Sequence, residues 1–361
     1  MMKKTRFGLI GCGDIAHVRY FYSFPLLKNA ELVGLYDINE PFLKATAEKL
    51  GVKAYDSYEQ MLDDLSIDAI IVTTYHPSHV QLSIQALKAG KHVISEKPVA
   101  TSVEDALLLK KEAQKSNRIF MALPNDASPE IVKVKELIDK NVIGNVCSID
   151  GLFAHQGPLH APWFFDYQKA QWGVLADLGI YPISTLTYLF GPVDRVSGET
   201  RCLQKRRISL QNEVIVPSVE DNAVATLAWA DGKLATIRSN WCTAADKNFC
   251  FWEMNIYGSD GIIYLNVMNK EETVVVISPD KPVEGGKQIK FKGLDCCYNI
   301  DVGDADVKAD VMKIFLKAVE KNEKMPDDGC SIVRQTHVIE IIDKIYQSSN
   351  LGKMMKIDSV F

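Results

Sequence analysis

The sequence predicts an α/β protein that begins with a doubly wound parallel sheet and continues into an α/β domain with a large, mostly antiparallel open sheet. In the first part, short apolar runs alternate with amphipathic segments, which is typical of parallel strands joined by helices. In the second part, apolar runs come in pairs around turn residues, which is typical of hairpins. The chain, at 361 residues, is also too long for one ordinary core.

The first part contains five apolar runs that we expect to form buried parallel strands. The segments between them carry apolar residues at three- and four-residue spacing, the pattern of amphipathic helices that cover both faces of such a sheet. The expected strands are Arg6–Ile10, Glu31–Tyr36, Ala69–Thr73, His92–Ser95 and Ile119–Ala122, and the expected helices are Pro41–Leu50, Tyr58–Leu65, His79–Ala89 and Val103–Lys115.

The second part is expected to contain hairpins. An Asp-Gly pair separates the apolar runs 222–229 and 233–241, and a Ser-Asp-Gly turn separates 251–257 and 262–267. We therefore place two domains at 1–124 and 125–361, with Pro129–Lys140 as the crossing helix. The C-terminal helix is expected to return to pack on the first domain.

Composition and charge exclude several classes of function. The 41 basic and 46 acidic residues give a formal charge of −5 without a strongly basic half, so a nucleic-acid partner is not expected. No apolar stretch approaches the ~20 residues that cross a bilayer. The run Phe7–Ile10 is too short for a signal peptide. Eight cysteines without a CxxC spacing indicate reduced thiols in a cytoplasmic protein.

The first strand leads directly into Gly11-Cys12-Gly13-Asp14-Ile15-Ala16, a G-x-G-x-x-A pattern. Gly11 permits a tight turn, Gly13 lets the backbone approach a pyrophosphate, and Ala16 lets the following helix pack against the strand. The N-terminus of that helix favours phosphate charge. In this context the pattern predicts a dinucleotide-binding Rossmann domain, with Asp14 and Ile15 also at the cofactor.

Asp37 ends the second strand, 21 residues after Ala16, where a carboxylate binds the ribose hydroxyls of an adenosine. A carboxylate there repels the additional phosphate of NADP, and no arginine follows within several positions to receive it. We therefore predict NAD as cofactor. NADP stays open because Lys44 lies one or two helical turns farther on. Thr73, the last residue of the expected strand Ala69–Thr73, and His76, which follows that strand, are further candidates for cofactor contact.

A second candidate segment reads Glu96-Lys97-Pro98 at the carboxyl end of the strand His92–Ser95. An open α/β sheet binds its ligands at this end of its strands, so Glu96 and Lys97 are expected at the cofactor. A surface position for the lysine is the alternative.

The sequence Ala89–Val93 followed by Glu96–Pro98, downstream of the glycine turn, resembles the Gfo/Idh/MocA oxidoreductase family, which includes glucose–fructose oxidoreductase, inositol dehydrogenases and dihydrodiol dehydrogenases. The resemblance continues through Trp172–Tyr181 and Leu189–Pro192, and it reappears at 341–346 and 348–353. It implies the two-domain architecture described above, and it implies hydride transfer between NAD(P) and a carbinol or carbonyl carbon of a sugar, polyol, inositol or cyclic diol.

The resemblance also implies the catalytic residues Lys97, Asp177 and Tyr181, where many members have histidine in place of the tyrosine. Asp177 and Tyr181 are four residues apart and so project from one helical face. A free tyrosine has a pKa of about 10, which an adjacent ammonium group would lower. We therefore expect Tyr181 to exchange the proton, Lys97 to polarise the substrate oxygen and Asp177 to orient the substrate or Lys97.

The loop before this helix contains His155, His160 and Trp163, which we expect to bind a small polyhydroxylated substrate. Structural histidines are the alternative, and no metal site is expected because the spacing matches no standard ligand pattern. The segment 122–129 lacks the arginine that many family members have there. A redox-assisted glycoside hydrolase and a non-catalytic dinucleotide sensor remain alternative functions. A homodimer or homotetramer is expected.

Overall fold

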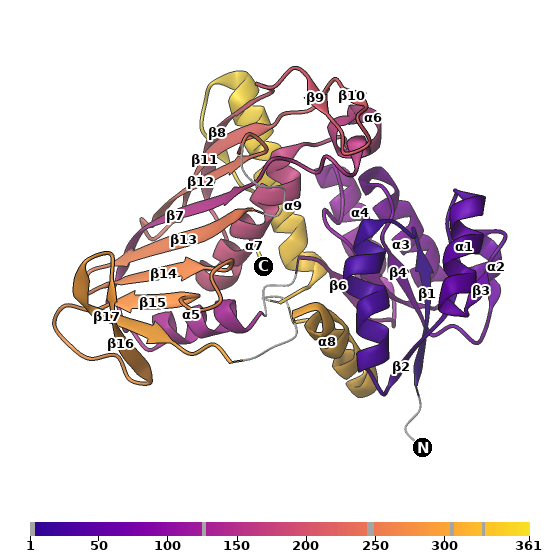
Figure 1. Cartoon of the computed structure of the whole chain (residues 1–361), viewed down its shortest axis with the longest axis horizontal. Helices are drawn as coiled ribbons and strands as arrows, with labels where there is room; N and C mark the ends of the chain where they lie inside the picture. The colour runs from indigo at the N-terminus through magenta and orange to yellow at the C-terminus, as the bar shows by residue number, and fades with distance from the viewer. Residues whose placement is uncertain (1–3, 125–127, 244–248, 304–306, 327–328) are drawn as a thin grey trace. The chain divides into compact units, whose positions relative to one another are not determined.

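The computed structural model describes residues 4–124, 128–243, 249–303, 307–326 and 329–361. The chain forms two compact units. The first consists of Met1–Asn125 with Ala305–Ile339, and the second consists of Asp126–Asp304 with Glu340–Phe361. Figure 1 labels the helices and strands of both.

The first unit is built on a six-stranded parallel sheet in the order β3-β2-β1-β4-β5-β6. The order reverses at β1, which leaves the gap between helices that such sheets use for ligands. This topology confirms the predicted Rossmann domain. The strands are β1 Thr5–Ile10, β2 Ala30–Tyr36, β3 Lys53–Ala54, β4 Ala69–Val72, β5 His92–Ser95 and β6 Phe120–Ala122. The helices are α1 Glu40–Leu50, α2 Tyr58–Asp63, α3 His79–Lys88, α4 Val103–Lys115, α8 Val307–Lys321 and the first part of α9, Ile332–Leu351.

Local sequence explains where these helices begin. The side chains of Asn39, Ser57 and Ser102 each accept a hydrogen bond from a backbone N–H in the first turn of α1, α2 and α4. The core includes Phe7 of β1 and Phe315 of α8, whose ring centroids lie 5.9 Å apart. The two-residue strand β3 was not predicted because two residues are too short to form an apolar run.

The second unit is built on a ten-stranded sheet in the order β16-β17-β15-β14-β13-β7-β12-β11-β8-β18. All neighbours are antiparallel except β7 and β12, which are parallel. The predicted hairpins β11–β12 and β13–β14 are both confirmed. The strands are β7 Val146–Ala154, β8 Arg195–Arg201, β11 Asn222–Ala228, β12 Leu234–Asn240, β13 Phe251–Gly258, β14 Ile262–Asn266, β15 Val274–Ile277, β16 Gly286–Phe291, β17 Leu294–Ile300 and β18 Met355–Lys356, with β9 Arg207–Ile208 and β10 Val214–Ile215 as a separate pair.

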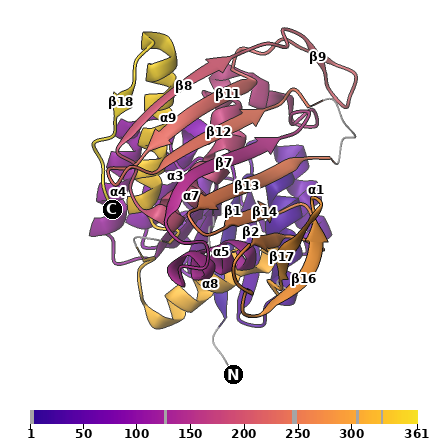
Figure 2. The same cartoon turned by 90° about the vertical axis from the view of Figure 1, so that its left-hand side faces the viewer.

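Helices cover one face of this sheet, as Figure 2 shows for α7, Ile180–Phe190, and α9. Gly151 of β7 and Gly198 of β8 stand in the same row of the register, so they face the same side. A Cβ on Gly151 would lie 3.4 Å from Pro182 of α7, and one on Gly198 would lie 2.8 Å from Ile345 of α9. Small residues in this row therefore let both helices approach the sheet closely. The helix α5, Pro129–Asp139, precedes β7.

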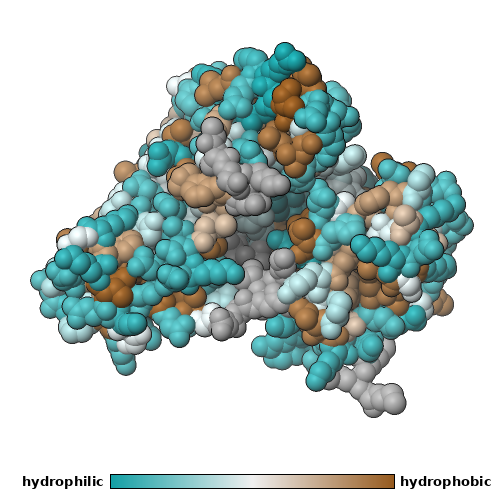
Figure 3. Space-filling model, viewed as in Figure 1, coloured by the Kyte–Doolittle hydropathy of each residue, from teal (hydrophilic) through white to brown (hydrophobic). Residues whose placement is uncertain are grey.

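The helical stretch Tyr167–Phe190 is long and apolar enough to cross a membrane by length and composition, but 83% of its most apolar window is buried inside the protein. Burial on all sides accounts for its apolar character. On the face of the molecule shown in Figure 3, hydrophobic residues form small separate patches among hydrophilic ones.

Candidate active site

The glycine turn after β1 has a backbone that other residues could not adopt easily. Gly11 has a φ of +92°, and a Cβ at this position would lie 2.7 Å from the carbonyl oxygen of Thr73. Gly13 is exposed, and a Cβ there would meet no atom within 4 Å in the described structure. Gly11 is therefore required by the fold, whereas the open side of Gly13 fits the close approach of a pyrophosphate.

Side chains from two further strand ends hold this turn. The carboxylate of Asp37 accepts hydrogen bonds from the backbone N–H groups of Cys12, at 2.7 Å, and Asn39, at 2.8 Å. The hydroxyl of Thr73 donates to the carbonyl oxygen of Gly11 at 2.5 Å. The structure thus brings Gly11, Asp37 and Thr73 together at one edge of the sheet. Asp14 and Ile15 begin the helix that follows, and Ala16 is buried against the core.

Glu96 is buried directly after β5, and two side chains of the first helix contact it. Its Oε1 lies 2.5 Å from Nη1 of Arg19 and accepts a hydrogen bond from the hydroxyl of Tyr20 at 2.9 Å. Burial, together with the charge of Glu96, raises the pKa of Tyr20 well above its ordinary value. The backbone N–H of Lys97 donates to the other carboxylate oxygen at 3.2 Å. Glu96 therefore anchors the half-buried Lys97 to the helix that follows the glycine turn.

Two histidines follow β4, His76 in the connecting segment and His79 as the first residue of α3. His79 is buried, with Nδ1 2.8 Å from the carbonyl oxygen of Pro98 and Nε2 2.9 Å from that of Thr74. Burial lowers its pKa, although both carbonyl contacts oppose this. His76 is also buried, and its ring centroid lies 6.0 Å from that of His79. His79 thus joins the loop after β4 to the loop that contains Lys97.

Asp177 and Tyr181 belong to the second unit and lie one helical turn apart, in the π-helical turn Leu175–Gly179 and the start of α7. Asp177 is buried, and its Oδ2 accepts a hydrogen bond from the indole Nε1–H of Trp241 at 3.2 Å. Tyr181 is half-buried, and its ring centroid lies 5.4 Å from that of Phe153 on β7. The two residues thus face the end of the sheet where β7 and β12 finish.

An aromatic cluster centred on Phe153 lies beside Tyr181 at this end of the sheet. Phe153 stacks on Trp252 of β13, with centroids 5.6 Å apart and ring planes inclined by 4°. His155, two residues farther along, packs edge-on against Phe153 at 6.3 Å. Strand alternation explains the grouping, because residues 151, 153 and 155 point to the same, helix-covered side. Phe153 and Trp252 were not among the predicted site residues, although this alternation could have indicated Phe153.

The remaining substrate candidates occupy different surroundings. The Nδ1 of His155 accepts a hydrogen bond from the backbone N–H of Gly157 at 2.8 Å, which shapes the loop. His160 is exposed. Trp163 stacks on Phe164 at 3.9 Å, and Phe164 in turn packs edge-on against Trp241 at 6.5 Å. His155 therefore joins the aromatic cluster beside Tyr181, and Trp163 connects through Phe164 to the tryptophan that contacts Asp177.

Glu220 lies at the start of the helical stretch that contains Asp177, and sequence analysis missed it. Its Oε1 accepts hydrogen bonds from the backbone N–H of Leu175 at 3.1 Å and from the hydroxyl of Tyr346 at 2.5 Å, and both oxygens lie 3.1 Å from the N–H of Gly173. Burial raises the pKa of Glu220 to about 7, even though these donors favour the ionised form. Glu220 thus fixes the beginning of this helix from a position 45 residues along the chain from Leu175.

A metal site would need several ligating side chains close together. Within the described ranges, no group of three or more His, Cys, Asp or Glu residues could hold a metal ion. The groups described above instead suit binding through backbone N–H groups, carboxylates and aromatic rings.

In comparisons with known proteins, both units match models of protein families. Residues 5–123 match the family described as "Oxidoreductase family, NAD-binding Rossmann fold", and residues 131–264 match "GFO/IDH/MocA C-terminal domain". Myo-inositol 2-dehydrogenase of Thermotoga maritima is 27% identical over 291 residues, covering 79% of this chain and 82% of that protein. Glucose-6-phosphate 3-dehydrogenase of Bacillus subtilis is 34% identical over 194 residues, covering 52% of this chain and 54% of that protein.

A solved structure extends the likeness of fold over the whole chain. Levoglucosan dehydrogenase in complex with NADH and L-sorbose superposes with a TM-score of 0.83 at 20% identity, covering 99% of this chain and 100% of that one. A levoglucosan dehydrogenase of Pseudarthrobacter phenanthrenivorans is 23% identical over 322 residues, covering 81% of each chain. With both domains matched in order, the chain belongs to the Gfo/Idh/MocA family of NAD-binding oxidoreductases.

Proposed function

We propose that this oxidoreductase interconverts a carbinol and a carbonyl group on a small cyclic polyhydroxylated substrate, namely a sugar, an inositol or another cyclic polyol or diol, with NAD as cofactor. The placement of Tyr181 carries the proposal, because a proton-transfer group and a buried carboxylate on the same helix lie beside an aromatic cluster. Aromatic faces pack on the C–H groups of sugar rings. The relatives named for inositol, levoglucosan and glucose-6-phosphate act on substrates of this kind.

The first unit would hold the cofactor. The backbone at Gly11, Gly13, Asp14, Ile15 and Ala16 would receive the pyrophosphate, and the carboxylate of Asp37 would bind the ribose hydroxyls. Thr73, His76, Glu96 and Lys97 would border the remaining part of the cofactor. When bound, the nicotinamide supplies the two-electron oxidation or reduction.

The chain's own side chains would handle the proton and the substrate oxygen. Tyr181 would exchange the hydroxyl proton, Lys97 would polarise the oxygen through its ammonium group, and Asp177 would orient the substrate or Lys97. An ammonium group near the phenol would also favour the phenolate, which a base near neutral pH requires. His155, His160 and Trp163 would contact substrate hydroxyls and C–H groups.

Steady-state turnover tests this proposal. The purified protein is mixed with NAD or NADP and a panel of aldoses, polyols, inositols and cyclic diols, and absorbance of the reduced nicotinamide is followed. We expect turnover with NAD, and we expect Tyr181→Phe to lower kcat by about 10²–10⁴-fold, the range for general acid–base catalysis. Tyr167→Phe, an exposed tyrosine on the neighbouring helix, is the control. Near-wild-type turnover by Tyr181→Phe would overturn the assignment.

We further propose that the enzyme is a cytoplasmic homodimer or homotetramer that associates through the sheet face opposite α7 and α9. Residues of this face such as Leu152 and Tyr257 are half-buried in the single chain, and Val224 is 43% exposed. Cys12 and Cys147 form no disulfide, which suits a reducing compartment. Light scattering after size-exclusion chromatography distinguishes a monomer from these assemblies.

A further inference from the structure

Asp177 is joined to the sheet by a chain of polar contacts that runs through Trp241. The ring of Trp241 is fully buried, and its indole N–H donates to Oδ2 of Asp177 at 3.2 Å. A charge-assisted hydrogen bond of this kind fixes both the position and the orientation of a carboxylate. Phe165, at 5.0 Å, and Phe164, at 6.5 Å, pack edge-on against the indole, so few alternative positions remain for the ring.

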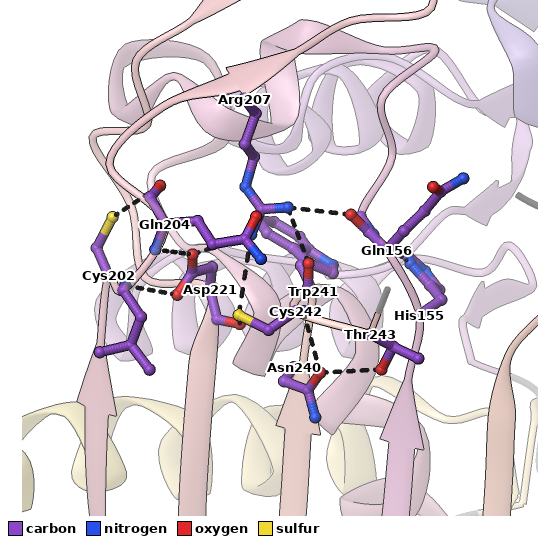
Figure 4. A network of polar contacts seen from close by, with 12 residues as sticks. His155, Gln156, Cys202, Gln204, Arg207, Asp221, Asn240, Trp241, Cys242 and Thr243 are labelled. Atoms are coloured by element: carbon purple, nitrogen blue, oxygen red, sulfur yellow. Dashed lines mark hydrogen bonds and ion pairs between the residues drawn. The ribbon is translucent and has the colours of Figure 1, made fainter. Parts of the chain in front are cut away.

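The backbone of Trp241 is held in turn by a buried ion pair, shown in Figure 4. Nη1 of Arg207 donates to the carbonyl oxygen of Trp241 at 2.8 Å, and Nη2 lies 2.9 Å from Oδ2 of Asp221. The backbone N–H of Trp241 donates to the carbonyl oxygen of Asp221, also at 2.8 Å. The side chains of Arg207 and Asp221 are only 4% and 0% exposed.

Further donors keep Asp221 in its charged form. The backbone N–H groups of Leu203 and Gln204 donate to its two oxygens at 2.8 and 2.9 Å. Burial alone would raise the pKa of Asp221, but these donors and the Arg207 guanidinium outweigh burial and lower it. The end of β12 is therefore fixed by a buried charge pair in which both terminal nitrogens of Arg207 and both carboxylate oxygens of Asp221 are hydrogen-bonded. Trp241 is the residue that extends from this pair to Asp177.

We propose that Trp241 is a positioning residue for the reaction: its indole N–H holds the Asp177 carboxylate in one orientation, and the Arg207–Asp221 pair holds Trp241. This inference rests on the proposed function, in which Asp177 orients the substrate or Lys97. Trp241 acts only through Asp177. Its contribution to turnover therefore disappears when Asp177 can no longer orient the substrate or Lys97.

Trp229 provides a matched control. It is also a buried tryptophan at the end of a strand in the same sheet, and its indole N–H donates to the carbonyl oxygen of Gly191 at 3.1 Å. Trp229→Phe and Trp241→Phe remove the same atoms from similar surroundings, and only the second removes a donor to Asp177. A loss of stability that both variants share therefore measures the effect of the removed indole on packing, separately from the contact with Asp177.

The kinetic test is a double-mutant cycle with a substrate found in the panel described above. We expect Trp241→Phe to lower kcat about tenfold, the lower end for losing a hydrogen bond to a charged group, with KM for NAD unchanged. Trp229→Phe leaves kcat unchanged. In an Asp177→Ala background, which leaves the indole N–H without its acceptor, Trp241→Phe has less than about a twofold further effect. Equal losses of kcat in both backgrounds, or in both tryptophan variants, would overturn the proposal.

A spectroscopic test needs neither activity nor a folded Trp241→Phe variant. In ¹⁵N-labelled full-length protein, Asp177→Asn is expected to shift one of the five indole N–H resonances and leave that of Trp229, identified with Trp229→Phe, in place. An unchanged set of five overturns the contact. If the wild-type protein turns over no panel member, the proposed function fails, while this measurement still decides whether Trp241 holds Asp177.

Discussion

The candidate site of the first unit consists mainly of backbone groups, whereas that of the second unit consists of side chains. In the first unit the site is mainly backbone, because Gly11 and Gly13 provide a turn whose shape follows from the absence of side chains. In the second unit the site is made of side chains, because Phe153 contacts Tyr181 and Trp241 contacts Asp177 from strands far apart in the sequence. One short sequence motif determines the geometry of the backbone site. The geometry of the side-chain site depends on how the strands of the whole sheet pair.

This difference predicts different weaknesses. A backbone site loses binding when a side chain is added at one position, while the rest of the fold limits the loss of stability. A side-chain site fails when a distant partner is removed, because each member is held by others across the sheet. The four predictions below test that contrast, beginning with the largest expected effect.

Arg207→Met is expected to lower the free energy of unfolding by about 3–5 kcal/mol, since it leaves the buried carboxylate of Asp221 without its cation. Urea denaturation measures this change. The control is Arg195→Met, because Arg195 pairs with Asp194 at 3.0 Å in an exposed position. Exposed pairs contribute about 0–1 kcal/mol. Similar losses in the two variants would show that burial of the Arg207–Asp221 pair adds nothing.

Gly11→Ala is expected to lower the free energy of unfolding by about 1–3 kcal/mol, because alanine rarely adopts its φ of +92° and the added Cβ would meet Thr73. Gly13→Ala has room for its methyl group, so it should unfold like the wild type while binding NAD more weakly. Thermal unfolding and calorimetric titration with NAD separate the two effects. Equal NAD affinity in Gly13→Ala and wild type would contradict the role of the open side of Gly13.

Asp37→Asn removes a negative charge but keeps an acceptor for the N–H of Cys12. The preference for NAD over NADP, measured as the ratio of kcat/KM values, is expected to fall at least about tenfold, the order of one unit charge acting on a phosphate near the surface. Glu48→Gln, an exposed carboxylate on α1, should leave the ratio unchanged. A preference that survives in Asp37→Asn would assign the discrimination to other residues.

The effect of Glu220→Gln on stability should depend on pH. The folded pKa of Glu220 is raised from 4.5 to about 7, so the protonated form stabilises the fold below pH 4.5 and this stabilisation is lost as the pH rises through 7. The Tm of Glu220→Gln should lack this decline between pH 4.5 and 7. The Tm change over that range should therefore differ between variant and wild type by roughly 3–6 °C. Glu213→Gln, an exposed carboxylate, serves as control. Parallel Tm profiles for wild type and Glu220→Gln would contradict the raised pKa.

The features that could be predicted from the sequence are those that depend on local information. The glycine turn, the alternating strands and helices and the Asp-Gly hairpin each depend on neighbouring residues, and all are confirmed in the structure. The contact between Trp241 and Asp177 spans 64 residues, and that between Glu220 and Tyr346 spans 126. Contacts of this kind require the strand register, which hydrophobic periodicity does not supply. The catalytic roles of Lys97, Asp177 and Tyr181 stay predictions.

The position of β7 in the sheet has a consequence for synthesis of the chain. This strand, Val146–Ala154, is made first among the strands of its sheet but lies between β12 and β13, which follow about 80 to 100 residues later. Until residues 234–258 leave the ribosome, both edges of β7 lack their partners. An unpaired strand edge is a template for association with other chains. The strand that places Phe153 beside Tyr181 therefore also exposes two unpaired edges during translation.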